Sequence, residues 1–141
     1  MAIQQSDVKY TAIATAENGR DGRVATTDGK LDVVVNPPKE MGGSGDGTNP
    51  EQLFAAGYSA CFQGALGVVA RNEKVDITGA TVTAEVGIGQ NDEGFGIIVA
   101  IKAAIPTLDA ATAKSLIEKA HQVCPYSKAT RGNITVGLAL A

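Results

Sequence analysis

The sequence predicts an α+β fold, a class in which strands and helices occur in separate runs along the chain. Apolar and polar residues alternate as in strands within the first 35 residues and again over 80–105. Helical periodicity occurs over 50–72 and 108–124. The length of 141 residues is typical of one domain, and no linker or internal repeat divides the chain, so we expect a single domain over 1–141.

The first part of the chain predicts three short strands, at 8–16, 23–28 and 31–35. The segment NGRDG at 18–22 is expected to turn the chain between the first two strands, because Asn-Gly and Asp-Gly accept positive φ angles. A glycine-rich loop follows the third strand at 41–47. These features predict a small antiparallel sheet ahead of the first helix.

A long helix is expected to begin near Thr48 and to run to about Asn72. Pro50 favours the first turn of a helix, and Thr48 and Glu51 have the spacing of a capping box. Residues 53–70 carry no charge, and this length is sufficient for a membrane span. Because five of them are Gly, Ser or Gln, we favour a helix enclosed by the fold or by a partner subunit and expect no membrane association.

The second half of the chain predicts a hairpin, a helix and a final strand. Alternating residues over 80–89 and 96–105 flank the turn sequence NDEG, which predicts an antiparallel hairpin. An apolar stripe over 108–124 predicts a helix that ends at Pro125. Alternating apolar residues over 134–140 predict the last strand.

Charge and aromatic content argue against a nucleic-acid partner. The formal net charge is −3, and the sequence holds three Tyr, three Phe and no Trp. A phosphate backbone needs a basic surface, and base stacking needs aromatic side chains. The first ten residues lack the basic and apolar stretches of a secretory signal, so we expect a protein of the reducing cytosol.

Cys61 and Cys124 are the two cysteines of the chain, too few for a secreted disulfide scaffold. Cys61 lies within the uncharged helix and Cys124 on the apolar stripe of the second helix, so both thiols are expected to point into one interior. They are either core residues or a reactive pair. A buried thiol becomes a nucleophile only when a cation lowers its pKa. The candidate cations are Arg20, Arg23, Arg71, Lys74 and Arg131.

The two thiols differ in their helical positions. Cys124 ends its helix, where the helix dipole disfavours a thiolate, so Cys61 is expected to attack and Cys124 to resolve. His121 lies one turn before Cys124 and is a candidate base, or a third zinc ligand beside the two cysteines. The paired ligand spacing of zinc sites is missing, so we expect no metal and favour an interaction of His121 with the helix dipole.

Three separated motifs occur in order along the chain. They are GRDG at 19–22, NPEQLFAAGYSACF at 49–62, and CPYS at 124–127 followed by ATRGN at 129–133. In these motifs, and over nearly its whole length, the sequence resembles the organic hydroperoxide resistance proteins, which share a superfamily with osmotically inducible protein C. Tyr58 and the CPYS segment favour the hydroperoxide branch of that superfamily.

That resemblance implies antiparallel sheets wrapped around two central helices, in an intertwined homodimer. It implies a thiol-dependent peroxidase that reduces alkyl and fatty-acid hydroperoxides to alcohols without a metal, haem or other bound cofactor. Cys61 matches the peroxidatic cysteine and Cys124 the resolving cysteine of the family. Arg20 and Glu51 match the pair that holds and polarises the thiolate. The implied reductant of the resulting disulfide is an external dithiol, carried by a lipoylated protein.

The first helix sets a limit on how this site is assembled. Glu51 and Cys61 are ten residues apart, about 15 Å along a straight helix. Either the helix bends sharply, or Glu51 and Arg20 reach a site that the other subunit completes, and we favour the second. A rival interpretation is an apolar-ligand-binding or stress-induced protein whose cysteines carry out no peroxidase chemistry.

Overall fold

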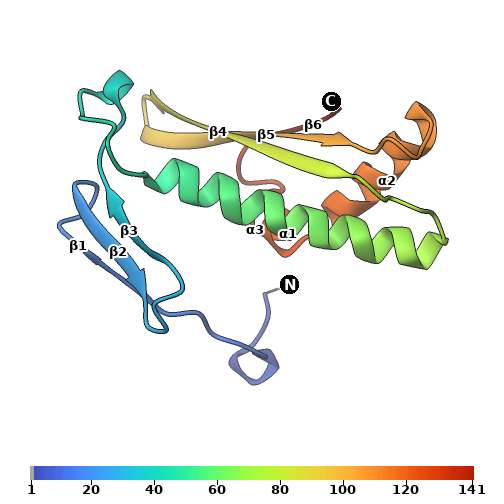
Figure 1. The fold of residues 1–141 in the computed structure, drawn as a ribbon, viewed down its shortest axis with the longest axis horizontal. Helices are drawn as coiled ribbons and strands as arrows, with labels where there is room; N and C mark the ends of the chain where they lie inside the picture. Colours follow the sequence, from blue (N-terminus) through green and yellow to red (C-terminus); the bar gives the residue numbers. More distant parts are fainter. Residues whose placement is uncertain (1) are drawn as a thin grey trace. The chain divides into compact units, whose positions relative to one another are not determined.

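The computed structural model describes residues 2–141, which divide into two compact units. The described residues up to Pro50 form the first unit, and Glu51–Ala141 form the second. Figure 1 shows the elements of each unit in the colours of the sequence. The structure belongs to the α+β class, as the sequence predicts, and the assignment of one domain stays a prediction.

The first unit is built on an antiparallel sheet. Its strands, which pair in chain order, are β1 (Ala14–Glu17), β2 (Gly22–Thr26) and β3 (Asp32–Val35). Single 3-10 turns at Gln5–Asp7 and Lys39–Met41 precede and follow them. The first strand is shorter than the predicted 8–16, because Thr26, the last residue of β2, already pairs with Ala14.

The second unit contains a mixed sheet. Strands β4 (Thr81–Asn91) and β5 (Gly94–Ala104) form the predicted hairpin, and β6 (Val136–Leu140) lies beside β5. Because β5 and β6 run parallel, this sheet is mixed rather than purely antiparallel. The reason is the connection between them, since a helical crossover brings the chain back in its original direction.

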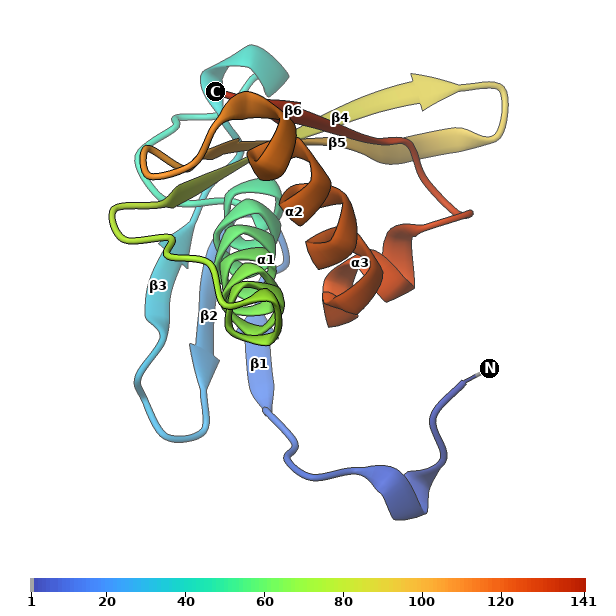
Figure 2. The ribbon, with the colours of Figure 1, turned by 90° about the vertical axis from the view of Figure 1, so that its right-hand side faces the viewer.

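Residues 2–141 contain three α-helices, namely α1 (Pro50–Glu73), α2 (Ala110–Val123) and α3 (Pro125–Thr130). Figures 1 and 2 show α1 and α2 on the same side of the sheet formed by β4, β5 and β6. The sequence does not predict α3. Pro125 follows the end of α2 and also occupies the first position of α3, where the missing N–H of proline is tolerated.

An apolar core joins α1 and α2 to the sheet. The buried residues of α1 are Tyr58, Phe62, Ala65, Leu66, Val69 and Ala70. Their helical spacing gives α1 one stripe, which packs with residues such as Ile101 of β5 and Leu116 of α2. Burying each large apolar side chain of this kind contributes about 1.5–3 kcal/mol to stability.

Among the described residues, α1 is the one helix that is long and apolar enough to cross a membrane by length and composition. A core helix passes the same test. Phe62 and Leu66 of α1 are inaccessible to solvent and pack in the core. Packing inside the protein therefore accounts for the apolar composition of this side of α1.

Candidate active site

The two cysteines predicted to react together are in contact. Cys61 lies near the middle of α1, and Cys124 lies at the junction of α2 and α3. Their Sγ atoms are 3.4 Å apart, with the Cys124 thiol donating to Cys61, and both cysteines are free. Cys124 is fully buried and Cys61 only partly so, which leaves Cys61 the more accessible of the pair.

Cys124 also caps α3. The backbone N–H of Ser127 donates to Cys124 Sγ at 3.5 Å, in the manner of an N-cap side chain. From the sequence, Cys124 is expected only at the C-terminal end of a helix, where the dipole disfavours a thiolate. Because the structure places it at the N-terminal end of a second helix as well, the dipole no longer distinguishes the resolving cysteine from the attacking one.

Burial raises the pKa of the Cys61 thiol above its ordinary value. The backbone N–H of Tyr126 acts in the opposite direction, because it stabilises negative charge on the sulfur. The neighbouring Cys124 raises the pKa further. A thiolate at Cys61 therefore requires a cation that offsets the effect of burial.

Arg20 belongs to the first unit, in the turn between β1 and β2. Asn18 and Gly19 adopt left-handed backbone angles in this turn, with φ of 61° and 57°. The Asn18 side chain donates to a backbone carbonyl of the same turn at 2.6 Å. A Cβ atom at Gly22 would collide with the backbone carbonyl oxygen of Glu17, so this position requires glycine. These local contacts, together with a hydrogen bond from the Asn36 side chain to Asp21 at 2.8 Å, hold the turn that carries Arg20.

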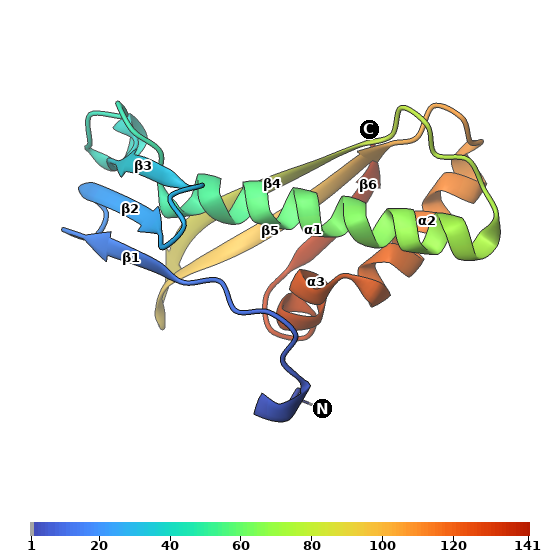
Figure 3. The same cartoon turned by 60° about the horizontal axis from the view of Figure 1, so that its bottom comes forward.

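Glu51 lies in the first turn of α1, ten residues before Cys61. The helix is continuous between them, and Figure 3 shows no sharp bend along α1. Ten residues of α-helix span about 15 Å. A sharp bend is therefore excluded as a means of bringing Glu51 next to the Cys61 sulfur of the same chain.

Two other candidate cations make structural contacts of their own. Arg23 donates to both carboxylate oxygens of Asp32, at 2.7 and 2.6 Å, on the exposed surface of the first unit. Arg131 donates to the backbone carbonyl of His121. These contacts give both arginines a role in holding local structure.

Aromatic side chains of α1 and α3 form a cluster near Cys61, whose sulfur also meets the backbone N–H of Tyr126. The rings of Phe54, Tyr58 and Tyr126 form a cluster with centroids 5.6 to 6.0 Å apart. Gly57 leaves room for this cluster, since a Cβ atom there would lie 2.6 Å from the Tyr126 hydroxyl oxygen. Tyr58 precedes Cys61 by about one helical turn. The sequence predicts an apolar setting for Cys61 but does not identify Tyr126 as part of it.

The same helices share a buried set of hydrogen bonds, which we call the hydroxyl network. Its members are Tyr58, His121, Ser127 and Thr130. Ser127 Oγ is 2.7 Å from His121 Nδ1 and 2.8 Å from the Tyr58 hydroxyl. The Tyr58 hydroxyl is 2.9 Å from Thr130 Oγ1. The sequence does not predict this network, which joins all three helices.

His121 takes part in hydrogen bonding through Nδ1. Burial lowers the pKa of His121, and the positive charge of Arg131 lowers it further, so the neutral ring is favoured instead of the cation expected at a helix end. Within residues 2–141, no group of three His, Cys, Asp or Glu side chains is arranged to hold a metal ion.

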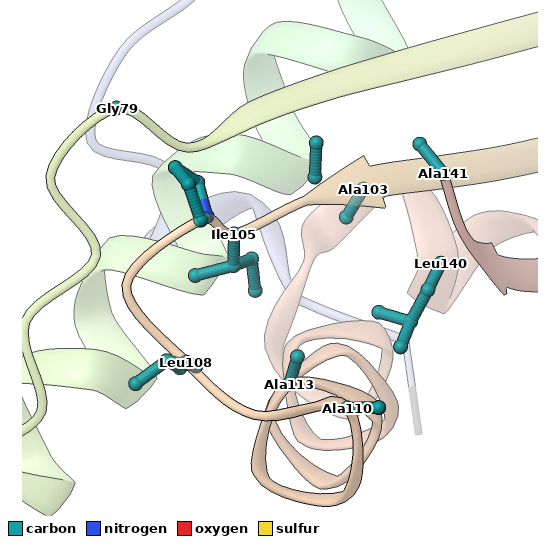
Figure 4. Close-up of a pocket in the computed structure, with 10 residues that line it drawn as sticks. Gly79, Ala103, Ile105, Leu108, Ala110, Ala113, Leu140 and Ala141 are labelled. Carbon is teal, nitrogen blue, oxygen red and sulfur yellow. The ribbon is translucent and has the colours of Figure 1, made fainter.

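A separate cavity lies in the second unit, where β5, β6 and the start of α2 meet (Figure 4). Its volume is about 380 Å³. Ile105, Leu108 and Leu140 line it together with Ala103 and Ala113. Neither cysteine borders this cavity, so it is distinct from the candidate active site, and its walls suit an apolar molecule.

Comparisons with known proteins agree with the motifs. The family model described as OsmC-like protein matches residues 43–139. An organic hydroperoxide resistance protein of Xanthomonas axonopodis pv. citri is 55% identical over 136 residues, covering 95% of this chain and 96% of that protein. A crystal structure of an organic hydroperoxide resistance protein from Elizabethkingia anophelis has a TM-score of 0.90 and 52% identity, covering 96% of this chain and 98% of that chain. The structure of OhrB from Bacillus subtilis has a TM-score of 0.87 and 42% identity, covering 95% and 100%.

Lowering the pH is expected to destabilise the protein through His121. Because folding lowers the pKa of His121 from 6.5, the unfolded chain binds this proton more readily than the folded chain. The free energy of unfolding should therefore fall as the pH drops below about 6.5. In His121→Gln this contribution is absent, so urea denaturation at a series of pH values should show a weaker pH dependence. An unchanged dependence in the variant would contradict the assignment.

Proposed function

The chain belongs to the OsmC-like protein family, and we propose that it is a thiol-dependent peroxidase that reduces organic hydroperoxides to alcohols. Relatives named organic hydroperoxide resistance proteins match nearly all of it. The observation that carries the proposal is the 3.4 Å contact between the sulfur atoms of Cys61 and Cys124. A two-cysteine peroxidase needs this proximity, because the first oxidation product has to meet a second thiol.

The proposed reaction has two steps on the protein. The Cys61 thiolate attacks the distal oxygen of the hydroperoxide and breaks the O–O bond, so that the alkoxide takes up a proton and leaves as the alcohol while Cys61 becomes a sulfenic acid. The Cys124 sulfur then attacks the Cys61 sulfur, and the hydroxyl group leaves with the Cys124 proton as water. An external dithiol reduces the resulting disulfide and is itself oxidised to a disulfide.

The greater accessibility of Cys61 supports its assignment as the attacking cysteine. A hydroperoxide has to reach the attacking sulfur, and Cys61 is only partly buried. The resolving sulfur has to reach only Cys61, and the fully buried Cys124 already touches it. Access therefore supports the same assignment as the family motifs.

Arg20 is proposed to supply the positive charge that a Cys61 thiolate requires. Burial raises the pKa of Cys61, and a guanidinium beside the sulfur would lower it again. Glu51 is proposed to orient this guanidinium through a pair of charge-assisted hydrogen bonds. Because α1 separates Glu51 from Cys61 by about 15 Å, we propose that a second copy of the chain completes the site.

One face of α1 suits a second copy of the chain. Ala56, Ala60, Gly64 and Val68 are exposed, recur every four residues and lie opposite the core stripe of α1. Uncharged small residues allow two helices to approach closely. A homodimer that buries this face would explain why residues 53–70 of α1 carry no charge on either side of the helix.

Apolar hydroperoxides are the proposed substrates, because the accessible rings of the cluster, Phe54 and Tyr126, favour an alkyl or fatty-acid chain over hydrogen peroxide. The proposed reductant is a lipoyl-type dithiol on a partner protein. No bound metal or organic cofactor takes part in the proposed steps. A dithiol reductant is available in the reducing cytosol, which is the proposed location.

A second candidate function is the binding of an apolar molecule without peroxidase chemistry. The apolar cavity of Figure 4 favours it, and so does the raised pKa of Cys61, because a protonated thiol is a poor nucleophile. Under this alternative the two cysteines are core residues that do not respond to hydroperoxide.

Intact-mass spectrometry after treatment with one equivalent of cumene hydroperoxide separates the two candidates. The unsubstituted protein should lose two hydrogen atoms, because a disulfide forms. Cys124→Ser should gain one oxygen atom, because its sulfenic acid has no resolving thiol. Cys61→Ser is the control and should keep its mass. Unchanged masses in all three proteins would contradict the peroxidase and favour the ligand-binding candidate.

Substitution of Arg20 or Glu51 should slow the oxidation of Cys61. Arg20→Gln and Glu51→Gln are expected to lower the rate constant by about 10- to 100-fold, the scale of one charge-assisted hydrogen bond. Arg23→Gln is the matched control, because Arg23 pairs with Asp32 at the surface of the first unit. Stopped-flow measurement with cumene hydroperoxide gives the rates. Equal rates for Arg20→Gln and Arg23→Gln would refute the role of Arg20.

Sedimentation velocity at micromolar concentration should show a species of twice the mass of one chain. Ala60→Glu places a charge on the exposed face of α1 and is expected to convert this species to a monomer, because an unpaired charge in an apolar interface is costly. Lys114→Glu, on the exposed side of α2, is the control and should leave the mass unchanged. A monomer for the unsubstituted protein rules out the completed site.

A further inference from the structure

We infer that Ser127 and Tyr58 position the two cysteines for disulfide formation, through a buried hydrogen bond beside the sulfur contact. The inference rests on the proposed peroxidase and deepens it, because it assigns these residues to the second step and not to the attack on hydroperoxide. Ser127 Oγ and the Tyr58 hydroxyl oxygen are 2.8 Å apart. Neither residue takes part in bond making or breaking, so both are positioning residues.

The hydrogen bond and the sulfur contact are neighbouring links between the same two segments. Tyr58 lies three residues before Cys61 on α1. Ser127 lies three residues after Cys124, in the first turn of α3. Three residues make about one helical turn, so on each segment the residue that carries the hydroxyl lies one turn from the cysteine. Tyr58 precedes Cys61 whereas Ser127 follows Cys124, so the two segments pair in opposite directions. The hydrogen bond and the sulfur contact are therefore neighbouring links.

Ser127 connects these two links directly. Its backbone N–H donates to Cys124 Sγ at 3.5 Å, while its side chain contacts Tyr58 and His121. Ser127 and Tyr58 are both 0% exposed, so water cannot replace a bond that either of them loses. Movement of Cys124 away from α1 would carry Ser127 with it and leave buried hydroxyl groups unpaired, which is unfavourable.

The hydroxyl network satisfies its members in either donor direction. When His121 Nδ1 donates to the Ser127 hydroxyl, that hydroxyl donates to Tyr58. The Tyr58 hydroxyl in turn donates to Thr130. The Thr130 hydroxyl then donates to the backbone carbonyl of Ser127 at 3.3 Å. When His121 Nδ1 accepts, the bonds between side chains reverse. No buried side-chain nitrogen or oxygen in the described part of the chain lacks a partner, so the network is complete with either tautomer of His121.

Positioning matters because a sulfenic acid at Cys61 has two fates. Attack by the Cys124 sulfur forms the disulfide and releases water. A second hydroperoxide molecule instead transfers one oxygen to the sulfenate, which yields a sulfinic acid and an alcohol and removes Cys61 from the cycle. The first fate depends on the placement of Cys124, while the second depends only on access of peroxide to Cys61. Loosening the hydroxyl network should therefore change the ratio of the two products.

The test compares two variants that each remove one hydroxyl group. Tyr58→Phe keeps the ring and its packing, and Ser127→Ala removes the link to both Tyr58 and His121. Ser59→Ala is the matched control, because the Ser59 hydroxyl lies on α1 but donates to the carbonyl of Ala56. The full-length proteins are treated with increasing equivalents of cumene hydroperoxide, and intact-mass spectrometry gives the ratio of disulfide to sulfinic acid.

Tyr58→Phe and Ser127→Ala are expected to lower the ratio of disulfide to sulfinic acid about five- to tenfold, the factor that corresponds to one buried hydrogen bond. Ser59→Ala should match the unsubstituted protein. In a Cys124→Ser background, Ser127→Ala should leave the rate of Cys61 oxidation unchanged. That rate reports the first step alone, so a purely local positioning role predicts no effect on it.

The possible failures are distinguishable. An unchanged product ratio in Tyr58→Phe overturns the inference and leaves the peroxidase standing, whether or not Ser127→Ala folds. A slower first step for Ser127→Ala in the Cys124→Ser background overturns it as well, because Ser127 would then act on the thiolate. If Cys61 is not oxidised in any of the proteins, the proposed function itself fails.

Discussion

The sulfur atoms of Cys61 and Cys124 touch within an apolar core, and this contact places two opposing demands on the chain. Burial keeps the second thiol within reach and away from water. The same burial raises the pKa of Cys61, which makes it a poorer nucleophile. A reactive site therefore needs a charge brought from elsewhere and a rigid hold on the second sulfur. Arg20 is the proposed source of the charge, and the hydroxyl network is the proposed hold.

Periodicity was sufficient to predict most of the fold, because apolar stripes are set by burial. The long helix, the central hairpin and the α2 helix occur within a few residues of their predicted bounds. Two features were not predicted. The short helix α3 follows a proline whose local signal is ambiguous, because proline marks both the end of one helix and the start of another. The parallel pairing of β6 depends on the crossover between distant segments.

The candidate site divides in the same way. The approach of the two sulfurs is predictable, because each cysteine lies among apolar residues on a helix that faces the core. The hydroxyl network is not, because Ser127 and Thr130 in a sequence are as typical of a helix end as of a buried contact. His121 illustrates the limit of local reasoning, since a helix end favours its cation while burial and a nearby arginine disfavour it.

The turn that carries Arg20 is held mainly by neighbours in sequence: two left-handed residues, one side-chain hydrogen bond and a glycine where a Cβ atom would meet the carbonyl of Glu17. One contact comes from further along the chain, because the Asn36 side chain donates to the Asp21 carboxylate at 2.8 Å. Such a turn is expected to be stiff. Displacing the backbone of Arg20 means swinging the whole β1–β2 hairpin with its ladder intact, because unravelling the tip would break each of these local features. A turn of this kind keeps the backbone of Arg20 in one position relative to β1 and β2, which suits the repeated charge-supplying role proposed for it.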